Sequence, residues 1–202
     1  EVIYRRRRNA LYGERLEVDI YNMIMDYAYA FVAANDGASL EEFNLGLIRE
    51  LSVESTMTEA DMKLDDNVKA EKLAEDIYQA YKRKVEQIAA IAYPVMKRVY
   101  EEHGANFQSI SVPFTDGKRG FQIPINLKRA VDSEGMDVYR QFSKLMVLFT
   151  IDDNWKEHLR DMDDLRQSVQ NASYEQKDPL LIYKFESFEL FSKMLEKTNR
   201  ET

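Results

Sequence analysis

Two long stretches of helical periodicity close the sequence, and the short polar turn between them most restricts the fold. From about Gly135 to Gln170 apolar residues recur every three or four positions, which predicts an amphipathic helix roughly 50 Å long. A polar turn over 171–178 follows, with Asp178 as the expected N-cap and Pro179 as the first residue of a return helix. Long amphipathic helices joined by a short turn pack antiparallel. The residues expected to face inward are Phe142, Leu145, Met146, Phe149, Leu159, Met162, Leu165 and Val169 on the first helix, and Leu181, Phe185, Phe188, Phe191 and Leu195 on the second.

Helical patterns also fill most of the first hundred residues. One apolar stripe predicts a single helix over residues 1–33, which ends at Asn35-Asp36-Gly37 because glycine tolerates the left-handed cap conformation. Ser39, followed by Glu42, predicts a capping box at the start of a shorter helix. A long helix is expected from about residue 67 to 103, and Pro94 inside it should kink or split that helix.

Residues 107–127 change to a period of two on either side of Asp116-Gly117, which indicates a β-hairpin. Pro113 and Pro124 each remove a backbone donor, so we expect a small edge-type ribbon and not the core of a sheet. The predicted fold class is therefore all-α, with long amphipathic helices, an antiparallel helical hairpin, a small helical subdomain and one inserted β-hairpin.

Charge and composition exclude several classes of function. The chain has 202 residues, no cysteine and a net charge of −8, and the segment 36–76 alone holds 12 acidic and 4 basic residues. Disulfide frameworks, thiolate metal sites and cysteine nucleophiles are excluded, and a nucleic-acid partner is not expected without a basic stripe beyond Arg5–Arg8. No apolar run is long enough to span a bilayer. Because the sequence begins with Glu1, we expect it to be part of a larger protein.

No pattern in the sequence predicts catalytic or metal-binding residues. The segment 116–120 lacks the glycine spacing of a phosphate-binding loop, and neither His103 nor His158 belongs to a Glu-x-x-His pair. Asp153, Glu157 and Asp161 share a helical face with basic residues, which is typical of a solvent-exposed surface. A carboxylate-metal enzyme remains a minor hypothesis that a metal assay would decide.

Two aromatic residues admit a structural and a functional interpretation. Trp155, the only tryptophan, is either a half-buried anchor where two helices cross or a contact with a partner. Tyr174 lies alone among polar residues at the tip of the predicted helical hairpin. It either folds back to cap the turn or presents a ring that grips other chains by apolar contact, without reading their sequence.

The last third of the chain closely resembles the SecA family of bacterial preprotein translocase motors. The shared segments are Trp155–Leu159, Met162-Asp163, Leu165–Gln167, Tyr174–Pro179 and Tyr183–Phe188. Looser similarity extends to Ile3-Tyr4 with Arg8-Asn9, and to Ser39–Glu42.

This resemblance implies a domain organisation. Residues 1–33 would be the end of a long scaffold helix, 34–104 the helical wing region returning to the scaffold, and 135–202 the two-helix finger. Residues 105–134, the β-hairpin, depart from the family pattern and resemble a lineage insertion to which we assign no function.

The resemblance also implies partners and site residues. In the family the finger contacts the secretory preprotein and the SecY channel, and its first helix lies against the nucleotide-binding domains and restrains ATP turnover. The implied polypeptide and channel contacts are Tyr174, Ser173, Glu175 and Gln176, and the implied interdomain contacts are Trp155, Leu159 and Arg166.

Other parts of the family's motor are not expected in these residues. ATP and magnesium would belong to the nucleotide-binding domains of the parent motor and zinc to its tail, so we expect this chain to be no enzyme and to hold no cofactor. The implied location is the cytoplasm, with peripheral attachment to the bacterial inner membrane. Apolar faces that meet the missing domains should favour a homodimer. The alternative is a stand-alone helical adaptor that binds a partner protein through its hairpin.

Overall fold

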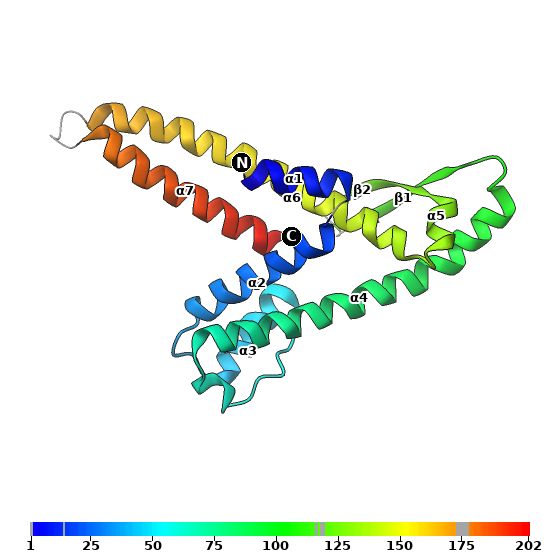
Figure 1. Cartoon of the computed structure of the whole chain (residues 1–202), viewed down its shortest axis with the longest axis horizontal. Helices are drawn as coiled ribbons and strands as arrows, with labels where there is room; N and C mark the ends of the chain where they lie inside the picture. The colour runs from blue at the N-terminus through cyan, green and yellow to red at the C-terminus, as the bar shows by residue number, and fades with distance from the viewer. Residues whose placement is uncertain (1, 14, 116, 118–119, 173–177) are drawn as a thin grey trace. The chain divides into compact units, whose positions relative to one another are not determined.

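The computed structural model describes residues 2–13, 15–115, 117, 120–172 and 178–202 of the chain (Figure 1). Helices dominate it, and one antiparallel pair of strands accounts for all the β-sheet of the described residues, which confirms the predicted fold class. The elements in chain order are α1 (Val2–Tyr12), α2 (Leu16–Ala34), α3 (Leu40–Leu51), the 3-10 helix η1 (Asp61–Lys63), α4 (Asp66–His103), β1 (Ser109–Thr115), β2 (Gly120–Asn126), α5 (Leu127–Asp132), α6 (Met136–Ala172) and α7 (Pro179–Glu201).

The chain divides into two compact units. Unit 1 comprises Glu1–Asp36, Asp66–Glu71 and Val147–Thr202, and unit 2 comprises Gly37–Asp65 and Lys72–Met146. The long helices α4 and α6 contribute residues to both units.

The first 34 residues form two helices, so the prediction of one continuous helix over 1–33 is wrong. Gly13 has φ of 72° and Arg15 has φ of 58°, and neither value is compatible with a right-handed helix. The apolar stripe continues on both sides of this break, with Ile3 and Ala10 buried on α1, and Leu16 and Ile20 on α2. The periodicity of apolar residues therefore gave no sign of the break between α1 and α2.

The predicted signals at the ends of the next helices are confirmed. Ser39 accepts a hydrogen bond from the backbone N–H of Glu42, whose carboxylate accepts one from the backbone N–H of Ser39 in return. These hydrogen bonds to Ser39 hold the pKa of Glu42 below its ordinary value. Helix α4 begins at Asp66 and continues through Pro94 to His103, so the proline does not split it.

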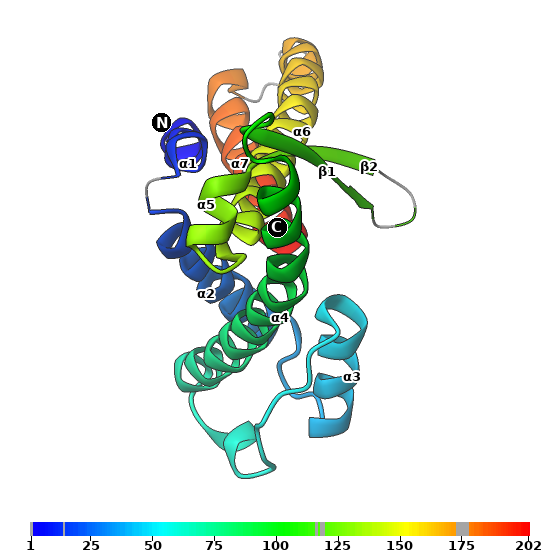
Figure 2. The same ribbon diagram turned by 90° about the vertical axis from the view of Figure 1, so that its right-hand side faces the viewer.

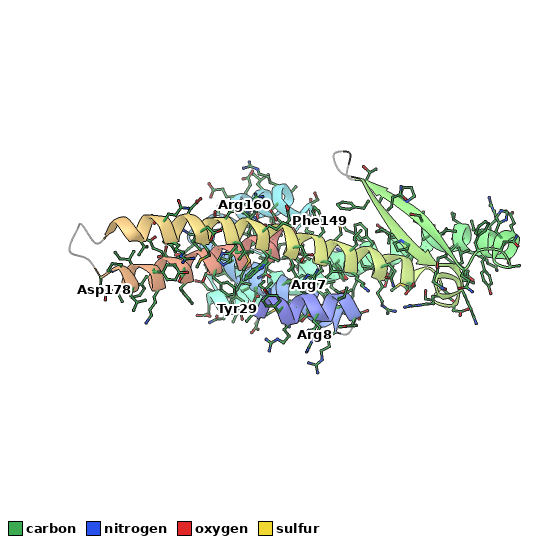
Figure 3. The ribbon with its side chains drawn as sticks, turned by 90° about the horizontal axis from the view of Figure 1, so that it is seen from above. Arg7, Arg8, Tyr29, Phe149, Arg160 and Asp178 are labelled. Carbon is green, nitrogen blue, oxygen red and sulfur yellow. The ribbon has the colours of Figure 1, made fainter. Side chains whose placement is uncertain are left out.

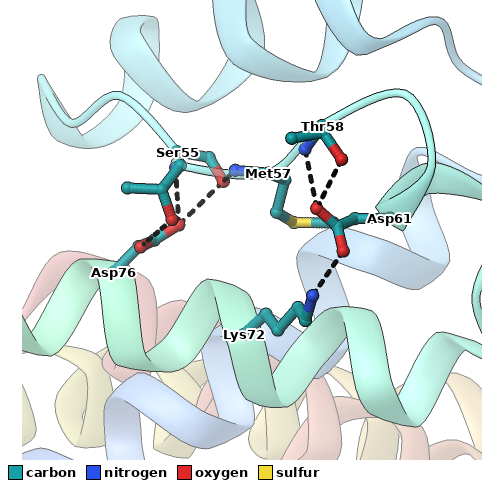
Figure 4. A network of polar contacts seen from close by, with 7 residues as sticks. Ser55, Met57, Thr58, Asp61, Lys72 and Asp76 are labelled. Carbon is teal, nitrogen blue, oxygen red and sulfur yellow. Dashed lines mark hydrogen bonds and ion pairs between the residues drawn. The ribbon is translucent and has the colours of Figure 1, made fainter.

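Asp76 of α4 fixes the loop that precedes the helix (Figure 4). Its carboxylate accepts hydrogen bonds from the Ser55 hydroxyl at 2.9 Å, and from the Thr56 backbone N–H and hydroxyl, both at 2.8 Å. A loop without regular structure satisfies its backbone donors through such side chains.

Asp61 holds the next part of the same loop. It accepts the backbone N–H and the hydroxyl of Thr58, both at 2.8 Å, and it pairs with Lys72 of α4 (Figure 4). Lys72 and the two Thr58 hydrogen bonds lower the pKa of Asp61 to about 2, because all three favour the ionised carboxylate.

The β-hairpin is two-stranded, as predicted, but one face of it belongs to the hydrophobic core of unit 2. Strands β1 and β2 pair antiparallel, with Ile110 opposite Ile125 and Phe114 opposite Phe121. Alternation along β2 buries Ile123 and Ile125 completely or almost so. The expectation of an edge-type ribbon and not the core of a sheet is confirmed, because the sheet of the described residues has only these two strands, and residues of α4, α5 and α6 pack against its buried face (Figure 2). The core comprises Met96, Ile123, Ile125, Leu127, Ala130 and Val138.

Gly135 joins α5 to α6 at a point of close backbone approach. Its φ is 88°, and a Cβ atom at this position would lie 2.4 Å from the carbonyl oxygen of Ala89 in α4. Only glycine meets both requirements, since a side chain would be strained by the dihedral angle and would also collide with backbone.

Replacement of Gly135 by alanine tests this constraint. We expect Gly135→Ala to lower the free energy of unfolding by roughly 3 kcal/mol, through the positive φ and the collision with Ala89. Gly117→Ala is the matched control, because Gly117 has φ of 86° and open space around it. The control should lose only about 1 kcal/mol in chemical denaturation, and equal losses would contradict the role of close approach.

The ion pair of Asp61 predicts a dependence of stability on acid. The folded-state pKa of about 2 lies below the ordinary value of 3.8, so the carboxylate stabilises the fold above pH 4 and loses this effect as the pH falls toward 2. Chemical denaturation at several pH values should show Asp61→Asn less stable than the parent at pH 6, with the gap narrowing below about pH 4 and closing only as the pH falls through 2. Glu59→Gln, in the same loop, should show no such convergence.

Candidate functional site

Helices α6 and α7 form an antiparallel pair within unit 1, which we call the helix pair (Figures 1 and 3). Asp178 caps α7 by accepting the backbone N–H of Leu180 at 2.9 Å, and Pro179 is its first residue, both as predicted. The buried positions on this part of α6 follow one stripe, in steps of one, three, four or seven residues. They are Val147, Thr150, Ile151, Asn154, His158, Leu165 and Val169.

A buried polar contact joins the two helices at their base, near the C-terminal end of α7. The Nδ2 atom of Asn154 lies 3.3 Å from the Thr198 hydroxyl and 2.9 Å from a carboxylate oxygen of Glu201. Thr198, completely buried, donates its hydroxyl to the carbonyl of Met194 at 2.8 Å. Buried polar groups that find partners in one arrangement alone fix the register of two helices.

The predicted inward face of the helix pair is partly wrong. Leu159 is 47% exposed, and Leu181, Phe185 and Phe188 of α7 are 52%, 65% and 71% exposed. On α6 the polar Asn154 and His158 take the inward positions. Helix α7 has apolar residues on more than one side, and the side with Met194 and Thr198 is the buried one. The other side leaves an apolar surface, which we call the α7 stripe and define as Leu181, Phe185 and Phe188.

Helix α1 holds the base of the helix pair through two arginines of its basic run. Arg7 donates to both carboxylate oxygens of Asp152 on α6, at 2.7 and 3.0 Å. These bonds raise the pKa of the Arg7 guanidinium. Arg6 donates to Asn199 of α7 at 2.9 Å and to Asp26 of α2 at 3.2 Å.

Asn199 closes this arrangement by donating to Asp26 at 3.1 Å. A bidentate arginine–carboxylate pair and a three-residue polar cluster therefore join α1 and α2 to both helices of the pair.

Trp155 lies next to the same contact. Its half-buried ring packs edge-on against Tyr4 of α1, with 5.8 Å between ring centroids, and lies 5.4 Å from the ring of His158. This is the geometry that the anchor interpretation predicts. Contact of Trp155 with another domain stays a prediction.

The remaining predicted site residues fall into two groups. Leu159 and Arg166 are exposed on α6, so both are accessible to a partner. Tyr174, Ser173, Glu175 and Gln176 lie outside the described residues, and their assignment as polypeptide and channel contacts stays a prediction.

His158 is a feature that the sequence analysis missed. It is 6% exposed, its ring lies edge-on to Phe191 of α7 at 5.8 Å, and its Nδ1 atom is buried without a hydrogen-bond partner. Burial lowers its pKa more strongly than Asp161 raises it. The signal was present, because Asn154 and His158 continue the spacing of Val147 and Ile151 along one helical stripe.

Within the described part of the chain, no cluster of three or more His, Asp or Glu residues could hold a metal ion. The same residues include no helix of the length and apolarity that a bilayer crossing requires. Glu157 pairs with Lys197 of α7, so one carboxylate of the predicted solvent-exposed face contributes to the contact between the helices.

Unit 1 is thus a long antiparallel helix pair held at its base by α1 and α2. The sequence profile of the SecA Wing and Scaffold domain family matches residues 1–202, and the chain belongs to this family. The matched range includes residues 105–134, so the β-hairpin lies inside the region that the profile covers.

Curated relatives carry the name protein translocase subunit SecA. The chain is 48% identical over 202 residues to the subunit of Parabacteroides distasonis, and 47% identical over 210 residues to that of Porphyromonas gingivalis. It is 47% identical over 205 residues to the subunit of Bacteroides fragilis. Each alignment covers the whole chain and 18% of the relative, so the chain spans about a fifth of the length of these proteins.

The buried contact of Asn154 gives a prediction for the stability of the helix pair. We expect Asn154→Ala to lower the free energy of unfolding by about 1–3 kcal/mol, because the buried Thr198 hydroxyl and the Glu201 carboxylate lose their donor. Asn22→Ala, at an exposed position of α2, is the control and should change it by less than about 0.5 kcal/mol. Chemical denaturation measures the free energy of unfolding of both variants. Equal effects would show that the Asn154 contact does not stabilise the base of the helix pair.

Proposed function

We propose that this chain is the mechanical and regulatory part of an ATP-driven protein-export motor. The helix pair would contact the secretory polypeptide and the cytoplasmic mouth of the SecY channel, and α6 would restrain ATP turnover by the nucleotide-binding domains. The protein would act in the cytoplasm and at the inner membrane. The family membership supports the general role, and the anchored helix pair is the observation that carries the mechanical one.

A stiff pair of helices suits the transmission of movement over tens of ångströms. The part of α6 that lies in unit 1, residues 147–172, is continuous helix and extends about 39 Å. Its base is fixed by the Arg7–Asp152 pair and by the contacts of Arg6 and Asn154. A displacement at the base would therefore move the opposite end of the helix pair as a rigid lever, as in domain motions about a fixed interface.

The α7 stripe supports contact with a polypeptide. Its three large apolar side chains are each more than half exposed. Apolar surface binds extended chains by burial of area and without hydrogen bonds to particular side chains. This tolerance suits a motor whose substrates share no sequence, and Tyr174 at the end of the helix pair would add a further ring.

Exposed residues on α6 support the proposed restraint of ATP turnover. Leu159 and Arg166 are accessible, and Trp155 lies beside the α1 contact. A nucleotide-binding domain that packs on this face would be held through Leu159 and Arg166. The nucleotide-binding domain would also respond to movements of α1, because Trp155 packs against Tyr4 of α1.

Export assays on a complete translocase subunit that carries these 202 residues test the proposal. We expect Tyr174→Ala, and a double change of Phe185 and Phe188 to serine, to reduce preprotein export at least about tenfold while basal ATP turnover survives, because contact with the polypeptide is lost. Leu159→Ser should instead raise basal turnover, because the restraint is released.

Leu45→Ser is the matched control, since Leu45 is 55% exposed on α3 and belongs to unit 2. Leu45→Ser should change neither preprotein export nor basal ATP turnover. If Tyr174→Ala and the double serine variant both export normally, the helix pair makes no essential contact with the polypeptide. The tip aromatic would then be a structural cap.

A further inference from the structure

The side chain of His158 lies where α6 and α7 meet, between the rings of Trp155 at 5.4 Å and Phe191 at 5.8 Å. It borders a small cavity of about 120 Å³ that also touches Asn154 and Met194. The imidazole therefore fills a partly apolar gap between the two helices.

We propose that His158 is a proton-sensitive contact that holds α7 against α6 when neutral and loosens it when protonated. A protonated imidazole has a proton on both ring nitrogens, and each needs an acceptor. Nδ1 is buried and has no partner in the folded structure. Separation of α7 from α6 gives this N–H access to water, and that movement also separates Phe191 from the ring.

The carboxylates that border the cavity beside His158 are Glu157 and Asp161 of α6. Glu157 is already paired with Lys197 of α7, and Asp161 favours the protonated ring but makes no hydrogen bond to its buried Nδ1. Lys193 and Lys197 of α7 border the same cavity, and their positive charges oppose protonation of the ring.

The more distant elements of unit 1 add no acceptor either, because their charges are engaged with one another. On α1, Arg7 is paired with Asp152 of α6. On α2, Asp26 accepts hydrogen bonds from Arg6 and Asn199.

The direction in which the pKa of His158 is shifted agrees with this arrangement. Burial places the pKa of His158 below its ordinary value of 6.5, and Asp161 only partly compensates. The folded state therefore binds this proton less well than the unfolded state, so the contact is at full strength above pH 6.5 and weakens as the pH falls through the folded-state pKa.

The composition of the chain makes the test direct. It has a single tryptophan, Trp155, which lies against His158, and only two histidines, of which His103 is exposed. Tryptophan fluorescence from pH 8 to 5 should show a transition with a midpoint below 6.5. The transition should persist in His103→Gln and disappear in His158→Gln.

Hydrogen exchange distinguishes loosening from simple titration. After correction for intrinsic rates, amides of α7 around Met194 should exchange about tenfold faster at pH 5 than at pH 7.5, because protonation of His158 favours the open state. His158→Phe, which keeps a ring between Trp155 and Phe191, should exchange equally at both pH values.

Either of two results overturns the proposal. A fluorescence transition without faster exchange in α7 would show that the ring titrates in place. Equal acceleration in the parent and in His158→Phe would show that another group is responsible. If both His158 variants fail to fold, the histidine ring-proton signals of the parent chain replace them. A His158 midpoint that does not coincide with the exchange transition then excludes the role.

Discussion

The ion pair between Arg7 and Asp152 is the contact on which unit 1 most depends. It joins α1, at the beginning of the chain, to α6, which lies 145 residues further on, and its bidentate geometry fixes orientation as well as distance. Around it, Arg6 reaches α2 and α7, and Tyr4 packs on Trp155. A partly exposed ion pair contributes little energy by itself, so its value lies in alignment. The apolar contacts of the helix pair then stabilise the arrangement that the polar contacts select.

In unit 2, the main packing requirement is burial of the apolar face of the two-stranded ribbon. A two-stranded ribbon is not stable alone, so β1 and β2 require a partner for their apolar face. Ile123 and Ile125 bury this face in the same core as Met96 of α4 and Val138 of α6. The ribbon thus fills the space between the end of one long helix and the start of the next. At the neighbouring junction, Gly135 permits the close approach to Ala89.

Local signals in the sequence predicted local structure well. The Ser39–Glu42 capping box, the Asp178-Pro179 helix start and the alternation of the β-hairpin depend on interactions within a few residues. Predictions that depended on tertiary contact succeeded less often. A stripe shows that a helix has an apolar side, but where α7 has two such sides, as at Phe188 and Met194, periodicity does not identify which one packs on α6. Nor does it reveal that a polar residue such as Asn154 takes an inward position, since its partners are 44 and 47 residues away.

The division of the chain between the two units has a consequence for the synthesis of the protein. Unit 2 is built from residues 37–65 and 72–146, whereas unit 1 joins residues 1–36 and 66–71 to residues 147–202. A chain emerging from the ribosome can complete unit 2 while Asn199, the partner of Arg6, has not yet been made. The contacts that Arg6 of α1 and Asp26 of α2 make with Asn199 can form only after α7 is synthesised. Helices α1 and α2 are therefore present in the nascent chain before this partner helix, which gives a chaperone time to bind their apolar faces.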